Sequence, residues 1–271
     1  MHGIGNDFVM VNGFETMPAE RELGGLAQAI CDRRFGVGAD GLIFALPGES
    51  AQFRMRMLNP DGSESEMCGN GIRCLAEFLV DEGLTTDASI PVETGAGLLV
   101  LERVSPGMVR VDMGIARLRP QELGMPDIAR DTWIEQPISA LGEEFLATAV
   151  SMGNPHAVLL VDDVECAPVA HLGPLLERHG RFPRRANVGF MQIVGPDHIR
   201  LRVFERGAGE TLACGSGACA AVVAGRLWGL LWPNVRVALR GGELSVHWAG
   251  EGEPAIMTGP AEKVFEGWIE S

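Results

Sequence analysis

Two cysteines of the chain stand immediately before a glycine, where a helix is expected to begin. Cys68 lies in "MCGNGIRC" and Cys214 lies in "ACGSGACA". The first N–H groups of a helix have no partners within it, and the helix dipole favours negative charge there. A thiol at that place is expected to lose its proton more readily than its usual pKa of about 8.5 allows. The two cysteines are therefore candidates for acid–base chemistry.

A pair of such thiols could invert a stereocentre. One thiolate would remove a proton from one face of a carbon, and the other thiol would deliver a proton to the opposite face. Glycines at 69, 71, 215 and 217 would let a carboxylate of the substrate approach backbone N–H donors. This mechanism requires neither a cofactor nor a metal.

Three other chemistries compete for these cysteines. Four cysteines could bind zinc, but the Cys-x5-Cys and Cys-x4-Cys spacings differ from the close pairs of structural zinc sites. A redox dithiol is a second alternative, although the chain has no Cys-x-x-Cys motif. The glycines could instead bind phosphate, yet the P-loop and dinucleotide-binding patterns are absent. We expect the remaining cysteines to pack as small buried hydrophobes: Cys31, Cys74, Cys166 and Cys219.

The two cysteine motifs belong to an internal repeat. Residues 53–84 and 199–230 align without a gap, at the spacing of 146 residues that separates Cys68 from Cys214. Upstream, Gly5-Asn6 corresponds to Gly153-Asn154 at a spacing of 148 residues. A period this long indicates two similar domains produced by duplication, not a solenoid.

The same order of elements is predicted in each half. After the Cys-Gly pair at 68, apolar residues at 72, 75, 76, 79 and 80 follow the spacing of an amphipathic helix. Strands gathered after a helix favour an α+β fold with mixed, largely antiparallel sheets. The segment 115–149 is expected to connect the halves. Upstream of each Cys-Gly helix we predict a strand (8–12; 156–161), a helix (20–33; 168–179) and two strands (41–46 and 53–58; 187–194 and 198–204).

Composition narrows the class of protein. The chain has 271 residues, is 46% hydrophobic and carries a net charge of −14, which disfavours nucleic acid or an anionic membrane as the main partner. It has no apolar run of the length of about 20 residues that a membrane span needs. The first residues, "MHGIGNDFVMVNGF", lack the pattern of a signal peptide. We therefore expect a cytoplasmic protein with free thiols.

Seven motifs, in order from residue 2 to about 261, resemble those of the diaminopimelate epimerases. They are "GNDFV", "FGVGADG", "NPDGSESEMCGNGIRC", "SMGNPHAV", "RANVGFMQ", "ERGAGETLACGSGACA" and "MTGPA". The resemblance implies an α+β fold of two similar domains related by a pseudo-twofold axis. Each would be a mixed, barrel-like sheet around a central helix, with the active site in the cleft between them. The expected domains are 1–116, to which 261–271 returns, and 117–260.

The resemblance also implies an activity. Diaminopimelate epimerases are isomerases that interconvert LL- and meso-diaminopimelate in the synthesis of lysine and of peptidoglycan precursors. They use no pyridoxal phosphate and no metal, so no cofactor is expected. The family further suggests a homodimer whose partner is a small-molecule substrate.

Site residues carry over by position. Cys68 and Cys214 correspond to the two catalytic bases, and His156 and Glu205 correspond to residues that tune those thiols. The residues matching substrate contacts are Asn6, Asn59, Asn154, Asn187 and Arg206. The residues matching backbone donors to the carboxylate of the reacting centre are Gly69, Asn70, Gly215 and Ser216. Arg206 could offer a bidentate fork to the distal carboxylate.

Two rival functions have their own signatures. Proline and hydroxyproline racemases of the same fold also use paired Cys-Gly sites, but usually carry His after the first pair and Thr after the second. Asn70 and Ser216 stand at these positions and favour diaminopimelate. A non-catalytic amino-acid-binding protein would need neither thiol, so the presence of both Cys68 and Cys214 favours an enzyme.

Overall fold

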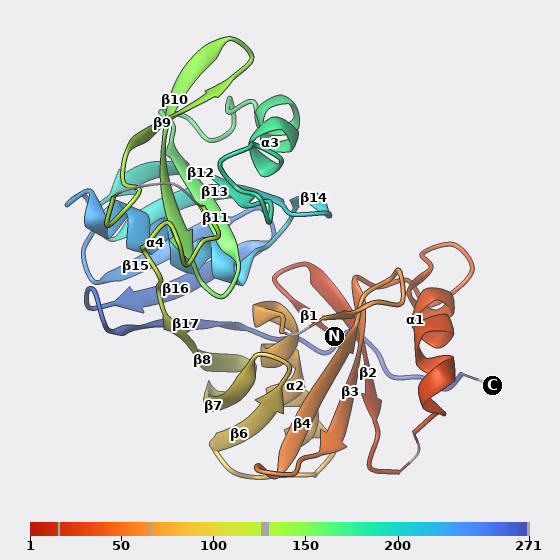
Figure 1. The fold of residues 1–271 in the computed structure, drawn as a ribbon. Coiled ribbons are helices and arrows are strands. Elements are labelled where there is room, and N and C mark those ends of the chain that lie inside the picture. The colour runs from red at the N-terminus through yellow and green to blue at the C-terminus, as the bar shows by residue number, and fades with distance from the viewer. Residues whose placement is uncertain (16, 66, 126–129, 270–271) are drawn as a thin grey trace. The chain divides into compact units, whose positions relative to one another are not determined.

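The structure is a computed structural model that describes residues 1–15, 17–65, 67–125 and 130–269. It consists of two compact units, one formed by Met1–Val111 with Thr258–Ser271 and the other by Asp112–Met257. The chain enters the second unit within one strand and returns to the first within another (Figure 1). The predicted boundaries after residues 116 and 260 stay a prediction, and residues 270–271 of the returning segment lie outside the described residues.

The N-terminal unit contains a mixed sheet. Strands β2 and β3 pair in parallel, as do β4 and β6, whereas β3–β4, β6–β7 and β7–β8 are antiparallel. The strands are β1 His2–Gly3, β2 Asn6–Asn12, β3 Gly41–Pro47, β4 Phe53–Leu58, β5 Glu64–Ser65, β6 Ser89–Thr94, β7 Gly97–Ser105 and β8 Met108–Ile115. The helices are the 3-10 helix Glu20–Glu22, α1 Leu23–Cys31 and α2 Gly69–Asp81.

The C-terminal unit repeats this pattern of pairing. Strands β11 and β12 pair in parallel, as do β13 and β15, whereas β12–β13 and β15–β16 are antiparallel. Its strands are β9 Gln136–Ala140, β10 Glu143–Ser151, β11 Pro155–Leu160, β12 Asn187–Gly195, β13 His198–Glu205, β14 Gly209–Thr211, β15 Asn234–Leu239, β16 Gly242–Trp248 and β17 Pro254–Pro260. Its helices are α3 Val169–Glu177 and α4 Gly215–Leu227.

The segment 115–149 is not the simple connection that we expected. It contains the antiparallel hairpin β9–β10, and β10 continues the sheet by pairing with β11. Alternating apolar residues of this segment, among them Ile138 and Ala147, are buried in the C-terminal unit. The segment is therefore part of the second unit.

The duplication predicted from the repeat is confirmed by the helices that follow the two cysteines. Helices α2 and α4 each contain 13 residues and occupy equivalent positions of the repeat. Two residues after the end of each helix stands a glycine with a left-handed backbone, Gly83 with φ 68° and Gly229 with φ 73°. A residue with a side chain would be strained in this conformation, and glycine closes a helix there without that cost.

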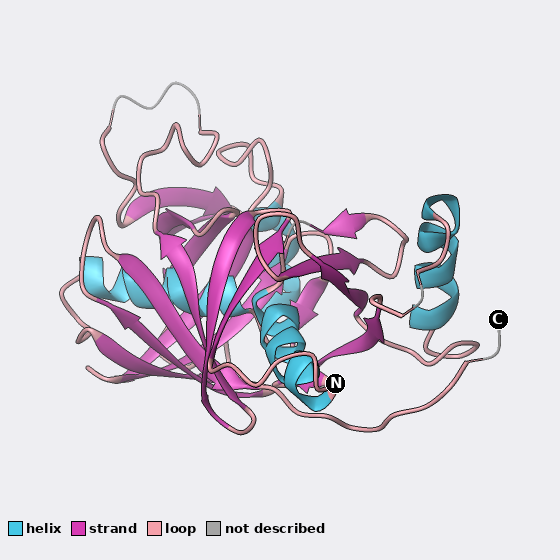
Figure 2. Cartoon of the chain, turned by 90° about the horizontal axis from the view of Figure 1, so that it is seen from below, coloured by secondary structure: helices cyan, strands magenta, loops and turns pink. Residues whose placement is uncertain are grey.

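Each of these helices is enclosed by strands of its own unit. Helix α2 contacts β1, β2, β3 and β7, and α4 contacts β10, β11, β12, β13 and β16. The strands are strongly curved, as Figure 2 shows, but the sheet does not close into a barrel. The predicted apolar face of α2 is buried at Ile72, Leu75, Ala76 and Leu79. Because strands cover more than one face, polar positions of α2 are buried as well, including Arg73. The α+β fold with a mixed sheet around a helix is confirmed.

Matching ion pairs brace the segment that leads into each cysteine. Arg56 on β4 lies 2.9 Å from Glu64 on β5, and Arg202 on β13 lies 2.7 Å from Glu210 on β14. Both arginines are mostly buried, with side chains 15% and 10% exposed, so water screens these pairs less than surface pairs. The pairs stabilise the short strands from which the chain turns into α2 and α4.

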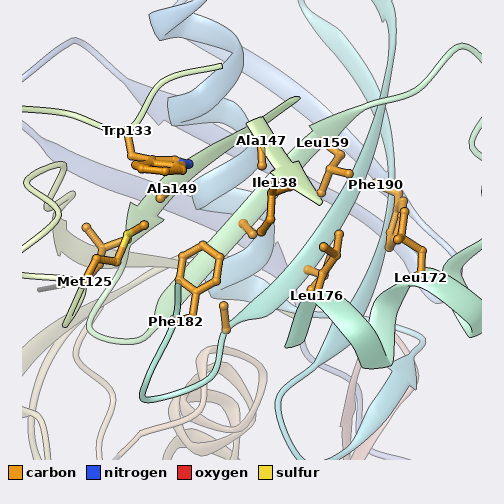
Figure 3. Packing of buried hydrophobic residues seen from close by; sticks show 14 of the residues in the cluster. Met125, Trp133, Ile138, Ala147, Ala149, Leu159, Leu172, Leu176, Phe182 and Phe190 are labelled. Carbon is orange, nitrogen blue, oxygen red and sulfur yellow. The ribbon is translucent and has the colours of Figure 1, made fainter. Parts of the chain in front are cut away.

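Helix α3 packs on the C-terminal sheet through a large apolar cluster. Leu172 and Leu176 on α3 lie near Phe190 on β12, and Phe182 belongs to the same cluster on the side of Met125 (Figure 3). These side chains are at most 2% exposed. The cluster extends to Ala186, immediately before β12, and thereby anchors the start of that strand.

Candidate active site

Cys68 caps helix α2 with an extended backbone, φ −134° and ψ 121°. Its side chain is partly exposed, and its sulfur lies 3.7 Å from Oδ1 of Asn6, the first residue of β2. The carbonyl oxygen of Cys68 accepts a helical hydrogen bond from the Ile72 N–H at 2.8 Å. Because α2 packs against β2, residues 62 positions apart in the sequence meet at the start of the helix.

Two amides and two charged groups form a hydrogen-bonded chain beside this sulfur. Arg73 Nη2 donates to Asn70 Oδ1 at 3.0 Å, and Asn70 Nδ2 donates to Asn6 Oδ1 at 3.0 Å. Asn6 Nδ2 donates in turn to Asp40 Oδ2 at 2.6 Å. Asn70 is 2% exposed and Arg73 is 0% exposed. We call Asn6, Asp40, Cys68, Asn70 and Arg73 the Cys68 site.

Arg73 places a buried cation at the start of α2. Its Nη1 donates to the Gly69 carbonyl oxygen at 2.9 Å, and its Nε donates to the Pro260 carbonyl oxygen at 3.1 Å. These bonds hold the guanidinium within the first turns of the helix. Its charge adds to the positive potential that the helix dipole already produces near Cys68.

Arg33 holds two carboxylates at the outer edge of the Cys68 site. Its Nη2 lies 2.6 Å from Asp7 Oδ1 and 2.7 Å from Asp40 Oδ1. The other oxygen of Asp40 also accepts the Asp7 backbone N–H at 3.2 Å. Burial opposes ionisation of Asp7, but hydrogen bonds from Arg33 and Asp40 hold the pKa of its carboxyl below its usual range. The ion pairs keep Asp40 in place as an acceptor for Asn6.

Cys214 caps α4 with φ −133° and ψ 105°, close to the values at Cys68, but it is only 3% exposed. Its sulfur lies 3.2 Å from Oε2 of Glu205, at the end of β13, and 3.7 Å from the Ser216 hydroxyl. The Thr211 hydroxyl donates to the other oxygen of Glu205 at 2.5 Å. We call Glu205, Thr211, Cys214 and Ser216 the Cys214 site.

The expectation that a helix start makes the thiol lose its proton readily is wrong for Cys214. Burial raises the pKa of the Cys214 thiol well above its usual value, and the charge and hydrogen bond of Glu205 raise it further. The Gly217 N–H and the Ser216 hydroxyl oppose this rise with smaller effects. Desolvation and a neighbouring carboxylate outweigh the helix dipole. Cys214 is therefore held as a protonated thiol.

The third residue after each cysteine is a glycine for reasons of packing. A Cβ on Gly71 would lie 2.6 Å from Cδ1 of Ile43 on β3. A Cβ on Gly217 would lie 3.1 Å from the Cys214 sulfur and 3.2 Å from Cγ2 of Val203 on β13. Glycine at these positions lets each helix approach the strand beneath it. The predicted donors Gly69, Asn70, Gly215 and Ser216 occupy the first two positions of α2 and α4, where N–H groups lie at the helix end.

The hydrogen-bond partner of the His156 ring is Asn154 and not a cysteine. Its Nε2 lies 2.9 Å from Asn154 Oδ1, and the residue is 1% exposed on β11. Burial lowers the pKa of His156 to about 3, and the charge of Arg206 contributes to this shift. The ring is therefore neutral near pH 7. Among the residues predicted to tune the thiols, Glu205 is the one in direct contact with Cys214.

Asn187 ties the start of β12 to the loop that carries Arg206. Its Oδ1 accepts the Arg206 backbone N–H at 2.9 Å, and its Nδ2 donates to the Pro155 carbonyl oxygen at 3.3 Å. The side chain of Arg206 is exposed. The buried carboxylate of Glu177 accepts the adjacent Gly207 N–H at 3.1 Å, which fixes the same loop.

Asn59 lies in the turn between β4 and β5. Its Nδ2 donates to the Ser63 hydroxyl at 3.0 Å, and its backbone N–H donates to the Ser63 carbonyl oxygen at 2.8 Å. The structure thus brings together four groups of predicted residues. They are Asn6 with Cys68, Gly69 and Asn70; Glu205 with Cys214, Gly215 and Ser216; Asn154 with His156; and Asn187 with Arg206.

Four residues of these groups were not predicted from the sequence: Asp40, Arg73, Glu177 and Thr211. A signal existed for Arg73, since position 73 lies next to the apolar face of the helix, and a buried charge needs partners. Asp40 lies within the quoted motif "FGVGADG". Thr211 likewise lies within the quoted motif "ERGAGETLACGSGACA". Glu177 had no such signal, because its partner lies on another element.

The other cysteines follow the packing expectation with one exception. Cys31, Cys74 and Cys219 are buried. Cys166 is exposed, contrary to expectation, and its thiol donates to Asp163 Oδ2 at 3.3 Å in the turn before α3. Within the described ranges, no cluster of His, Cys, Asp and Glu side chains is arranged to hold a metal ion. None of the described helices has the length and apolar character of a membrane span.

The family model for diaminopimelate epimerases matches residues 1–119 and 148–264 of this chain. A diaminopimelate epimerase of Thioalkalivibrio sulfidiphilus (strain HL-EbGR7) is 52% identical over 278 residues, covering 100% of this chain and 97% of the relative. A diaminopimelate epimerase of Moorella thermoacetica (strain ATCC 39073 / JCM 9320) is 50% identical over 272 residues, covering 98% of this chain and 96% of the relative.

Two solved structures share the fold at low sequence identity. A phenazine biosynthesis protein of the PhzF family from Bacillus anthracis has a TM-score of 0.70 at 19% identity, covering 99% of this chain and 95% of its own. A hydroxyproline epimerase from Agrobacterium vitis has a TM-score of 0.69 at 17% identity, covering 96% of this chain and 87% of its own. At these identities the likeness is one of fold alone.

Proposed function

Because the chain belongs to the diaminopimelate epimerase family, and is therefore an isomerase, we propose that it interconverts LL- and meso-diaminopimelate by proton transfer between two thiols and the substrate. The observation that carries the proposal is that each unit starts an equivalent helix at a cysteine, Cys68 or Cys214, with nearly the same backbone conformation. Two equivalent thiols suit a reaction that needs one base and one acid.

The proposed step balances in protons and bonds. A thiolate takes the α-proton of the substrate, so that a C–H bond breaks and an S–H bond forms. The other thiol then protonates the opposite face of the carbanion, so that its S–H bond breaks and a C–H bond forms. The configuration at the carbon is inverted, and the two cysteines have exchanged protonation states. The proposal requires the substrate α-carbon to lie between the two sulfurs.

The contacts of the Cys214 site support a role for Cys214 as the acid in the enzyme before the substrate binds. Its thiol is buried, and Glu205 accepts its proton in a hydrogen bond at 3.2 Å. Glu205 is in turn held by Thr211, so the carboxylate stays aligned with the sulfur. We propose that Cys214 donates its proton in the direction that begins with a Cys68 thiolate, and accepts one in the reverse direction.

The substrate has an amino acid group at each end, so it needs partners for two carboxylates and two ammonium groups. We propose that Gly69, Asn70, Gly215 and Ser216 bind the carboxylate at the reacting centre through the helix starts. Five other residues are proposed to contact the substrate: Asn6, Asn59, Asn154, Asn187 and Arg206. The exposed guanidinium of Arg206 is suited to the distal carboxylate. We propose that the neutral His156 acts with Glu205 to tune the thiols.

The residue content supports a mechanism without pyridoxal phosphate. That cofactor is held by a lysine as a Schiff base. The chain has one lysine, Lys263, and its ammonium group is 2.7 Å from Glu266 in an exposed ion pair. Cysteines are thus the residues that offer acid–base chemistry at the two helix starts.

We further propose that the protein works in the cytoplasm, in lysine and peptidoglycan precursor synthesis, and forms a homodimer. Exposed apolar side chains support self-association. Val264, Phe265, Trp268 and Ile269 follow β17 and are 62%, 66%, 96% and 59% exposed. Such clusters are typical of protein interfaces. Sedimentation velocity of the wild type and of Trp268→Ser measures this: a dimer that weakens in the variant is expected, and a wild-type monomer would contradict the proposal.

Incubation of the purified protein with LL-diaminopimelate in heavy water tests the function. We expect the meso isomer to form, with deuterium at the inverted α-carbon. L-proline and trans-4-hydroxy-L-proline serve as the rival substrates, and inversion of these alone would identify a racemase of the same fold. Binding of diaminopimelate without exchange or inversion would identify a non-catalytic binding protein.

A further inference from the structure

The amide groups of Asn6 and Asn70 lie between a group that can only donate and a group that can only accept hydrogen bonds. A guanidinium has no acceptor, and an ionised carboxylate has no donor. Arg73 bonds Asn70 Oδ1 at 3.0 Å, and Asp40 bonds Asn6 Nδ2 at 2.6 Å. The direction of the bond between the two amides, from Asn70 Nδ2 to Asn6 Oδ1, follows from these ends.

This direction decides which atom of Asn6 faces the thiol. Asn6 Oδ1 lies 3.7 Å from the Cys68 sulfur, so Cys68 meets an oxygen that can accept its proton in a hydrogen bond. Were the Asn6 amide reversed, its NH₂ group would face the Asn70 NH₂ group, and its oxygen would face the Asp40 carboxylate. Both contacts are repulsive, so the reversed amide is excluded as long as both ends are present.

We propose that Asp40 and Arg73 are positioning residues that act through Asn6 and Asn70 to keep the Asn6 oxygen beside Cys68. The inference rests on the proposed function, because it assigns these residues to the thiol of the same reaction. Neither residue needs to touch the substrate. The C-terminal unit has no such device at the equivalent positions, where Ala186 corresponds to Asp40 and Cys219 corresponds to Arg73.

Of the two charged groups at the ends of this hydrogen-bonded series, Asp40 is the one that can be replaced without disturbing a buried cation. Its side chain is 41% exposed, whereas Arg73 is fully buried. Asp7 provides a matched control, because it is also an aspartate and binds the same Arg33, at 2.6 Å. Each carboxylate also accepts the backbone N–H of the other aspartate, at 3.2 Å in both cases. Among the contacts described for the two aspartates, only Asp40 accepts a hydrogen bond from the Asn6 side chain.

The experiment compares Asp40→Ala, Asp40→Asn and Asp7→Ala with the wild type. Epimerisation is followed with LL-diaminopimelate, and the alkylation rates of Cys68 and Cys214 are measured by mass spectrometry of the peptides that contain each cysteine. We expect Asp40→Ala to lower kcat/KM at least about tenfold, the order expected for losing one hydrogen bond to a charged group. It should change the alkylation rate of Cys68 but not that of Cys214. Asp40→Asn should restore most activity, because its oxygen can still accept from Asn6.

Asp7→Ala should stay within about threefold of the wild type. It loses a surface ion pair, which contributes little, and the 3.2 Å bond from the Asp40 N–H, but it keeps the bond between Asn6 and Asp40. If Asp40→Ala does not fold, Asp40→Leu takes its place, because leucine keeps the shape of the side chain without an acceptor. The inference is overturned if Asp40→Ala matches the wild type, if Asp7→Ala loses as much activity, or if both cysteines change in reactivity together. A wild type that does not epimerise diaminopimelate would instead overturn the proposed function.

Discussion

The Cys68 site and the Cys214 site have nearly the same backbone at the cysteine and different neighbouring groups. Both cysteines cap a helix of 13 residues, with φ of −134° and −133°. Cys68 is partly exposed beside amide groups and near the buried cation Arg73. Cys214 is buried, and its sulfur is 3.2 Å from the carboxylate of Glu205. Duplication thus preserved the position of the thiol while the groups around it diverged.

The divergence is concentrated in side chains at equivalent positions. Arg73 in the first unit corresponds to Cys219 in the second, and Asn70 corresponds to Ser216. Burial and a carboxylate favour the protonated form of Cys214, whereas the neutral amide of Asn6 lies beside Cys68. A reaction that needs a base on one side and an acid on the other is served by such a difference. The predictions below test it from the largest effect to the smallest.

Replacing either thiol should remove the activity. We expect Cys68→Ala and Cys214→Ala each to lower kcat for epimerisation by about 10²–10⁴-fold, the contribution of a positioned acid or base. The assay is the conversion of LL- to meso-diaminopimelate. Cys74→Ala and Cys219→Ala are matched controls, because both residues are buried within the same helices. Equal loss in all four variants would show that the helix-start cysteines have no special role.

Removing the charge at Glu205 should remove one difference between the surroundings of the two thiols, the carboxylate beside Cys214. In Glu205→Gln we expect the pKa of Cys214 to fall toward its usual value, because burial still raises it but the carboxylate no longer does. The pH dependence of Cys214 alkylation measures the shift, with Cys68 in the same sample as the reference. Activity should drop about tenfold, as for the loss of one hydrogen bond to a charged group. An unchanged profile for Cys214 would remove Glu205 from the account of this site.

The buried thiols should make stability fall at alkaline pH. Burial raises the pKa of Cys74 to about 12, above the value of an unfolded thiol. The unfolded chain therefore loses the proton first, and stability present below about pH 8.5 decreases as the pH rises toward 12. The chain has no tyrosine and one lysine, so few other groups titrate in this range. Cys74→Ala should reduce the loss between pH 8 and 10.5 by about 2 kcal/mol in urea unfolding under reducing conditions. An equally steep loss in the variant would contradict the assignment.

His156 should make stability fall at acidic pH, whereas the buried thiols make it fall at alkaline pH. Burial, with a contribution from Arg206, lowers its pKa to about 3, so the folded chain holds the neutral ring. The unfolded chain binds the proton below about pH 6.5, and stability is lost as the pH falls from there toward 3. His156→Gln should reduce the loss between pH 7 and 5.5 by about 1.4 kcal/mol. The same titration of His171→Gln is the control, because that histidine is exposed. No difference between the two variants would argue against a buried neutral His156.

The sequence alone determined the duplication, the two helix-start cysteines and the order of the elements, because these depend on local pattern. The apolar spacing of a helix, a Cys-Gly pair and the glycines beside it can each be recognised within a short stretch of sequence. The segment 115–149 was misjudged because its residue pattern did not show that the hairpin β9–β10 pairs with β11 and extends the sheet. The exposure of Cys166 likewise depends on where the fold places the loop that carries it.

Only the tertiary structure decided the electrostatics of the two sites. The helix start alone favours an ionised thiol at Cys214, but the end of β13 brings Glu205 against the sulfur and the surrounding strands exclude water. The roles of Asp40 and Arg73 also depend on strands and helices that are far apart in the sequence and come together in the fold. A pKa and an amide orientation are set by every group within a few ångströms, and folding assembles those groups from several elements.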